Sequence, residues 1–273
     1  MSKKRVLFVT QEMSPYTDSN EISDLVGKLP LHMYSKGYEV RVLMPRFGLI
    51  NERRHRLHEV VRLSGMNIIV DDDDYPLIIK VASLPGARLQ VYFLDNDEFF
   101  KRKNLFNDDE GTPYEDNAER MVFFCKGVIE TVRKFGWPPD IIHCHGWMTS
   151  MIPMFIRQAY KSDPVFHETQ ILYSAYPHEM NGLLQDNFIS KASINNLSKK
   201  DLDIFVSEGN ISLERGAFAY ADACIKGSVT SIGDVDTLLD ESNKPVLRVE
   251  DEATYLNDHL EFYKMLTQKN VPT

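Results

Sequence analysis

The hydrophobic pattern at the start of the chain predicts a strand, a helix and a second strand. Residues 5–10 form a short apolar run with β-branched and aromatic members, which is typical of a buried parallel strand. Apolar side chains then recur at helical spacing over residues 22–34, and Gly37 is placed to end that helix. Residues 38–44 form the second apolar run. This order is the opening of a doubly wound α/β fold.

The pattern changes in the next fifty residues. Residues 59–63, 66–70, 77–83 and 88–94 are short β-prone runs separated by polar turns, so we expect a mixed or antiparallel addition to the main sheet. The four aspartates of residues 71–74 stand between two of these runs. They could bind calcium, but they lack the ligand alternation and the glycine of a calcium loop, so we expect a solvated hairpin tip.

The second half of the chain alternates strands and helices again. The predicted helices cover 115–135, 148–160, 213–221 and 254–268, and the predicted strands cover 140–144, 170–175 and 223–226. Residues 181–210 are polar and irregular with short helical pieces, 228–240 are helix or loop, and Pro245 marks a break. We predict an α/β fold with a Rossmann-like, mostly parallel sheet and helices on both faces. Residues 1–240 are expected to form one domain, with 241–273 as a helical extension that packs on it.

Composition and charge narrow the classes of partner. A chain of 273 residues that is 43% hydrophobic can bury a core without disulfides, and the cysteines are interpreted as reduced, buried thiols: Cys125, Cys144 and Cys224. The formal net charge of −9 argues against nucleic acid or an anionic membrane as the main partner. No apolar run approaches the roughly 18 residues of a membrane span or the length of a signal peptide. We therefore expect a cytoplasmic protein.

Four segments, in this order, carry a family resemblance. They are residues 15–30 with 37–47, residues 92–120, residues 139–147 (Pro-Asp-Ile-Ile-His-Cys-His-Gly-Trp) and residues 215–223 (Arg-Gly-Ala-Phe-Ala-Tyr-Ala-Asp-Ala). Together they resemble the N-terminal lobe of bacterial glycogen synthases and plant starch synthases, which are ADP-glucose-dependent retaining glucosyltransferases. The resemblance implies one lobe of a GT-B enzyme. In that architecture the N-terminal lobe supports the glucan acceptor, and the C-terminal lobe holds the nucleotide.

The first of these segments departs from the family in the loop that faces the donor phosphates. The family pattern Lys-Thr-Gly-Gly-Leu falls on Asp18, Ser19, Asn20, Glu21 and Ile22. A lysine and two glycines at a helix N-terminus cradle a phosphate, whereas two carboxylates there would each repel a diphosphate by about 1 kcal/mol or more. Ser19, Asn20 and Glu21 still suit the start of a helix. We expect a loop that has kept its structural role and lost its chemical one.

The third segment supplies the candidate catalytic residue. Where the family has His-x-His-Asp-Trp, this chain has His143, His145 and Trp147, with Gly146 in place of the aspartate. In the relatives the cleft histidine contacts the sugar near the reacting carbon, so the resemblance points to His145. Two alternatives stay open, because the histidines could be satisfied polar residues at a buried strand end, or could share a zinc ion. The family's Thr-x-His-Asn segment falls on residues 174–177, where Tyr176 could stack on a sugar face.

The second segment supplies a candidate acceptor groove. Tyr114, Asp116, Asn117 and Arg120 match the family pattern. The functional interpretation is that Tyr114 and Asp116 line a groove for a neutral glucan; the alternative is that Asp116 and Arg120, at i and i+4, pair on the helix surface. The predicted glucan-binding residues are Tyr114, Asp116, Asn117, Arg120, His145, Trp147 and Tyr176.

The residues that would bind the ADP-glucose donor decide which function we expect. The family continues into a second lobe, but this sequence ends at Thr273, so no donor-side Glu-x7-Glu pattern can be placed. We expect a glycogen/starch synthase-like protein of α-glucan metabolism that lacks autonomous ADP-glucose:1,4-α-glucan glucosyltransferase activity. It would act as a glucan-binding or regulatory module whose partner is an α-1,4-glucan or maltooligosaccharide, with no cofactor and no metal.

Two alternatives stay open at this point. The chain could be a catalytic glucosyltransferase that works with a separate donor-lobe chain, in which case ADP-glucose would also be a ligand. It could instead have an unrelated role in binding a ligand or a protein partner on the same fold, because a fold does not fix a function.

Overall fold

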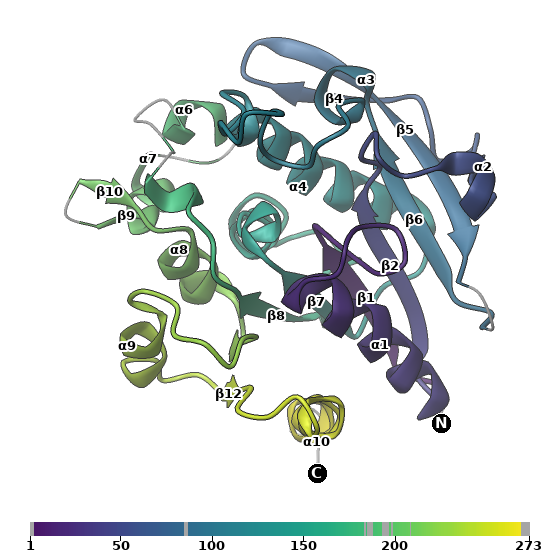
Figure 1. Cartoon of the computed structure of the whole chain (residues 1–273). Coiled ribbons are helices and arrows are strands. Elements are labelled where there is room, and N and C mark those ends of the chain that lie inside the picture. Colours follow the sequence, from purple (N-terminus) through teal and green to yellow (C-terminus); the bar gives the residue numbers. More distant parts are fainter. Residues whose placement is uncertain are drawn as a thin grey trace.

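The apolar runs of the sequence come together in one large twisted sheet in the computed structural model (Figure 1). The structure describes residues 3–84, 87–182, 184, 188–192, 197, 199–207 and 209–268. The strands are β1 (Arg5–Thr10), β2 (Glu39–Pro45), β3 (His58–Glu59), β4 (Met66–Val70), β5 (Asp73–Ser83), β6 (Gln90–Asp95), β7 (Ile141–His145), β8 (Gln170–Ala175), β9 (Val206–Ser207), β10 (Asn210–Ile211), β11 (Ala223–Lys226) and β12 (Val246–Arg248). The α-helices are α1 (Glu21–Ser35), α2 (Glu52–His55), α3 (Asp97–Phe100), α4 (Asn117–Phe135), α5 (Ile152–Met154), α6 (Phe188–Ala192), α7 (Lys199–Leu202), α8 (Leu213–Tyr220), α9 (Val235–Asp240) and α10 (Tyr255–Gln268).

The sheet is parallel through most of its width. Its order is β12-β11-β8-β7-β1-β2-β6-β5-β3, and β4 pairs with β5 outside this path. Every pair from β12 to β6 is parallel, whereas β5 runs antiparallel to β6, β3 and β4. In the centre Thr10 is in register with His145, and His145 with Ser174. The carboxyl ends of β1, β7 and β8 therefore lie side by side, where α/β folds place their sites.

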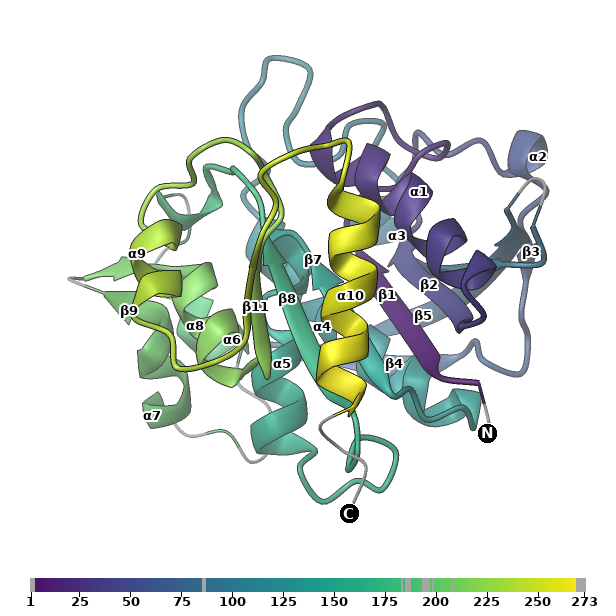
Figure 2. The same cartoon turned by 90° about the horizontal axis from the view of Figure 1, so that it is seen from below.

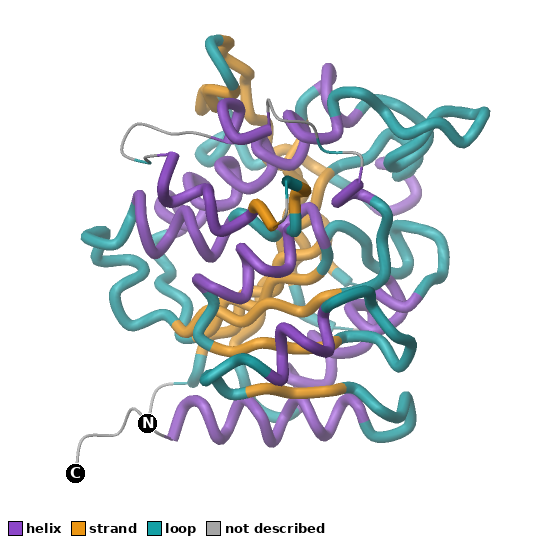
Figure 3. The backbone as a smooth tube through the Cα atoms, turned by 90° about the vertical axis from the view of Figure 1, so that its left-hand side faces the viewer, coloured by secondary structure: helices purple, strands orange, loops and turns teal. Residues whose placement is uncertain are grey.

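Helices cover both faces of this sheet. In Figure 1 α4, α5 and α8 lie on one side of the strands, and α1 and α10 lie on the other. Figure 2 shows α10 running alongside α1 across the middle of the sheet, and Figure 3 shows the strands as a central band with helices outside it. A parallel sheet needs both faces covered because its strands are apolar on both sides. The predicted α/β class, with a mostly parallel Rossmann-like sheet, is confirmed.

Local sequence signals fix where the main helices begin and end. Asn20 caps α1 through a capping box, in which the Ser23 amide donates to Asn20 Oδ1 at 2.9 Å and the Asn20 amide donates to Ser23 Oγ at 2.9 Å. Gly37 follows α1 at φ +94°, and Gly136 ends α4 at φ +58°. Both angles lie in the left-handed region that glycine adopts without strain.

Several predicted elements differ in detail from those observed. The predicted helix over 148–160 is divided into a 3₁₀ turn at Trp147–Thr149, then α5, then a π-helical turn at Phe155–Ala159. Pro153 lies in the first turn of α5, where a missing amide is tolerated. The predicted strand over 59–63 shrinks to β3, and β12 forms directly after Pro245, where only a break was expected.

The remaining predictions for the fold have mixed outcomes. Asp71 and Asp72 form the turn between β4 and β5, so the hairpin tip is confirmed. The three cysteines are buried and free, as expected. Part of the irregular region 181–210 lies outside the described residues, as do residues 269–273. The domain boundary at residue 240 stays a prediction. Among the helices that the structure describes, none is long and apolar enough to cross a membrane.

Candidate functional site

A groove opens at the N-terminus of α4, and three of the predicted glucan-binding residues line it. Its volume is about 630 Å³. The lining residues are Thr112, Pro113, Tyr114, Glu115, Asp116, Asn117, Ala118, Glu119, Met180, Leu184 and Lys191. Tyr114, Asp116 and Asn117 are therefore brought together, on a wall that mixes an aromatic ring with carboxylate and amide groups.

Arg102 holds the aromatic and acidic side chains of the groove in place. Its two terminal nitrogens donate to the two carboxylate oxygens of Asp116, each at 2.6 Å, and its guanidinium lies 4.4 Å from the centre of the Tyr114 ring. The alternative interpretation, in which Asp116 pairs with Arg120 on the helix surface, is therefore wrong. Asp116 precedes the first residue of α4, and its side chain turns to Arg102 instead.

Arg120 lies beneath the groove and is fully buried. Its Nε donates to the Phe99 carbonyl at 2.7 Å, and one terminal nitrogen donates to Asn117 Oδ1 at 2.7 Å. Burial lowers the pKa of Arg120 to about 10, and its other terminal nitrogen has no hydrogen-bond partner among the described residues. Arg120 therefore orients Asn117 from below, and it has no exposed surface with which to contact a glucan.

The candidate catalytic histidine lies elsewhere, inside the protein. His145 is 0% exposed; its Nδ1 lies 2.9 Å from the Tyr176 hydroxyl, and its Nε2 has no partner within the described part of the chain. Its neighbour His143 is satisfied at both nitrogens, by the Tyr263 hydroxyl at 2.6 Å and by Ser174 Oγ at 2.7 Å. Burial holds the pKa of both histidines well below the ordinary value, so both rings are neutral.

Trp147 and Tyr176 are also buried. Each is 2% exposed, and the Trp147 ring packs edge-on against Phe106 with 5.0 Å between ring centres. Neither side chain lines the groove at α4. The structure thus divides the predicted glucan-binding residues between α4, where Tyr114 and Asp116 are partly exposed while Asn117 and Arg120 are buried, and a buried set at the ends of β7 and β8. Over the described residues, no group of three His, Cys, Asp or Glu side chains is arranged to hold a metal ion.

Gly146 has a structural reason to differ from the family's aspartate. Its φ is +81°, and a Cβ built there would lie 2.4 Å from Gln11 Oε1. Gln11 in turn accepts a hydrogen bond from the Met148 amide at 3.2 Å. A side chain at residue 146 would therefore meet both an unfavourable backbone angle and an occupied space.

The loop before α1 is closed by its own side chains. The Asn20 side-chain amide donates to the buried carboxylate of Glu12, and Ser19 Oγ donates to Asp24 at 2.7 Å. Burial raises the pKa of Glu12, although hydrogen bonds from Gln11 and Asn20 oppose the rise. The helix N-terminus that cradles a phosphate in the family pattern thus faces carboxylates and a capping side chain here.

Sequence reasoning missed one buried polar cluster. His178 Nε2 bonds to Glu214, and the Asn181 amide donates to the second Glu214 oxygen at 2.7 Å, which ties the loop after β8 to α8. Burial alone would raise the pKa of Glu214, but these hydrogen bonds hold it below its ordinary value. No spacing in the sequence signals this cluster, because more than thirty residues separate Glu214 from its partners.

The comparisons with known proteins identify the family. A family model described as the starch synthase catalytic domain matches residues 5–243. The chain belongs to this family. The chain is 37% identical over 188 residues to a glycogen synthase from Chlorobium phaeobacteroides, a match that covers 68% of this chain and 38% of that protein. It is 34% identical over 220 residues to a glycogen synthase from Chlorobaculum parvum, which covers 80% and 44%.

A solved structure agrees with the starch synthase fold. The catalytic domain of starch synthase IV from Arabidopsis thaliana, bound to ADP and acarbose, superposes with a TM-score of 0.75 over 93% of this chain and 53% of that one. At 20% identity this likeness supports the fold alone. The chain spans about two fifths of the length of the curated relatives that it matches.

Proposed function

We propose that this chain is an α-glucan-binding member of the starch synthase catalytic domain family whose donor-phosphate loop does not bind ADP-glucose. The observation that carries the proposal is the closed, acidic N-terminus of α1. Family membership supports the connection to α-glucan metabolism, and the groove at α4 supports the acceptor side.

Both the charge and the occupied space at the N-terminus of α1 disfavour a bound diphosphate. Asp18 and Glu21 place two carboxylates where the family pattern has a lysine and a glycine, and the side chains of Asn20 and Ser23 already use the first free groups of the helix. A diphosphate would meet repulsion and would have to displace the capping box. Neither cost is offset by a cation in this loop.

The groove at α4 has side chains that suit a glucan acceptor. Tyr114 offers a partly exposed aromatic ring, and Asp116 offers carboxylate oxygens that can accept hydrogen bonds from hydroxyls. Asn117 is buried, and its side chain is already bonded to the Phe106 carbonyl and to Arg120. The Arg102 guanidinium, which is bonded twice to Asp116, limits the freedom of that carboxylate before a ligand arrives. A groove ordered in this way loses less conformational entropy when it binds.

A calorimetric comparison of maltoheptaose and ADP-glucose tests the proposal. We expect maltoheptaose to bind and ADP-glucose to give no heat at the same concentrations. Elongation of a maltodextrin primer from ADP-glucose by the purified chain would contradict the proposal. Binding of ADP-glucose only after a separate donor lobe is added would favour the heteromeric glucosyltransferase instead.

A further inference from the structure

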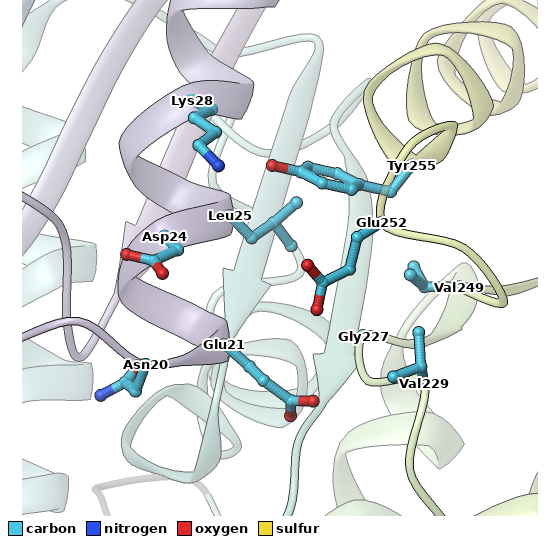
Figure 4. Close-up of a pocket in the computed structure, with 10 residues that line it drawn as sticks. All are labelled: Asn20, Glu21, Asp24, Leu25, Lys28, Gly227, Val229, Val249, Glu252 and Tyr255. Atoms are coloured by element: carbon cyan, nitrogen blue, oxygen red, sulfur yellow. The ribbon is translucent and has the colours of Figure 1, made fainter.

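A second pocket lies between α1, the loop after β11 and the start of α10, away from the groove at α4. Its volume is about 240 Å³, and it shares no lining residue with that groove. Its walls come from three segments that are far apart in the sequence, around Glu21, Val229 and Tyr255 (Figure 4). We propose that this pocket binds a small ligand that carries a primary ammonium group.

Two carboxylates line the pocket from different segments of the chain. Figure 4 shows Glu21 reaching from α1 and Glu252 reaching from the segment before α10. One oxygen of Glu21 accepts a hydrogen bond from Ser228 Oγ at 2.9 Å, and Glu252 has no hydrogen bond or ion pair among the described residues. A third carboxylate in the lining, Asp24, is engaged by Ser19. An ammonium placed between Glu21 and Glu252 would have an acceptor on each side.

Tyr255 gives an independent indication of a ligand. The residue is only 8% exposed, and its hydroxyl has no hydrogen-bond partner in the described part of the chain. In Figure 4 this hydroxyl points across the pocket toward α1. This hydroxyl is open to the pocket and not enclosed by protein, so it is available to donate to or accept from a ligand. The ring beside it also suits an organic cation.

The balance of charge selects a cation over an anion. Three carboxylates line the pocket, and the cation among its lining residues is Lys28, which forms no ion pair with any described residue. The pocket therefore keeps an excess of negative charge that repels phosphates and attracts an amine. Lys28 competes with such a ligand for the same carboxylates, so its removal should strengthen binding of an amine and weaken binding of an anion.

Calorimetry on the full chain at about pH 6.5, where amines are protonated, tests the proposal. The probes are glucosamine and putrescine, with N-acetylglucosamine as the uncharged control and glucose 1-phosphate as the anionic control. We expect at least one amine to bind, and neither control to bind. Glucosamine alone would identify an amino sugar, and putrescine alone a linear amine. Absence of binding by both amines at millimolar concentration, or equal binding of N-acetylglucosamine, would overturn the proposal.

Three variants assign the binding to this pocket. Glu252→Gln should raise the dissociation constant of the amine about tenfold, because the ammonium loses a charged acceptor and keeps only a neutral amide oxygen. Lys28→Met should lower it, and Glu241→Gln, which removes an exposed carboxylate outside the pocket, should leave it unchanged. An unchanged constant in Glu252→Gln, or weaker binding in Lys28→Met, would contradict the proposal. The groove at α4 shares no lining residue with this pocket, so these variants should leave maltoheptaose binding unchanged. Failure of the amine proposal can therefore be told apart from failure of the proposed glucan binding.

Discussion

At the scale of single residues, Gly146 stands where the family pattern has an aspartate, and its backbone angle favours glycine. Its φ of +81° and the closeness of Gln11 leave no room for the family's aspartate. Gly65 has nearly the same angle, +80°, but no atom lies within 4 Å of a Cβ built there. Gly65 therefore serves as a comparison for the contact at residue 146, because it has a similar φ and open space at its Cβ position.

We expect Gly146→Ala to lower the free energy of unfolding by about 3 kcal/mol, because strain and overpacking add. Gly65→Ala should cost about 1 kcal/mol, because it carries the angle alone. Urea unfolding of both variants measures the difference. Equal losses in the two variants would show that Gln11 moves aside without cost.

Tyr114 is the residue that tests the glucan groove. We expect Tyr114→Ala to raise the dissociation constant for maltoheptaose about tenfold, because an aromatic stacking face is lost. Tyr34→Ala is the matched control, since Tyr34 is 41% exposed on α1 and lies outside the groove. Unchanged affinity in Tyr114→Ala, measured by calorimetry, would place the glucan elsewhere.

At the scale of elements, α10 covers three neutral imidazoles. His259 on α10 and His143 on β7 have 5.7 Å between ring centres, and His143 and His145 have 3.8 Å. The Tyr263 hydroxyl bonds to His143, and Asp258 is the charged group on α10 that acts on His259. Burial lowers the pKa of all three histidines, to about 4 for His259.

Stability should therefore fall as the pH drops below 6.5. The unfolded histidines bind protons near pH 6.5 and the folded ones do not, so their contribution is present above that pH and is lost as the pH falls toward 4. For His259 alone the loss is about 3 kcal/mol. Urea unfolding between pH 7.5 and pH 5 measures the slope.

Two histidine variants locate the source of this pH dependence. His259→Gln should flatten the slope, because it removes one of the buried imidazoles. His167→Gln should leave the slope unchanged, because His167 is exposed and pairs with Glu168 at the surface. A slope that is the same in all three proteins would contradict the assignment to the cluster under α10.

At the scale of the whole molecule, residues 241–268 add both a strand and a helix to the fold. Strand β12 extends the sheet beyond β11, and Tyr263 of α10 packs against Phe8 in the central strand, with 6.5 Å between ring centres. We propose that this segment is part of the same folding unit as residues 1–240.

A chain shortened to residues 1–240 tests this proposal. We expect it to lose cooperative unfolding or to aggregate, because β11 becomes an edge strand and an apolar face of the sheet is uncovered. Calorimetric unfolding beside the full chain measures the effect. A shortened chain with the same melting temperature would show that the extension is a separate addition.

The sequence by itself determined the elements whose signals are local. The apolar run of β1, the helical spacing and capping residues of α1, and the glycines after α1 and α4 each act over a few residues, so periodicity and turn chemistry were enough to predict them. The same is true of the hairpin tip, which the structure places at residues 71–72. Family motifs also follow from sequence, because they are patterns of residue types at short spacing.

Only the tertiary structure decided which polar side chains meet and which are exposed. His143 and Tyr263 are 120 residues apart, so nothing local shows that α10 closes over the candidate histidines. Asp116 pairs with Arg102 and not with its helical neighbour Arg120. The three residues of β12 are extended because they pair with β11. Burial and long-range pairing depend on the packing of the whole chain, and this is why the open groove and the buried site could not be told apart beforehand.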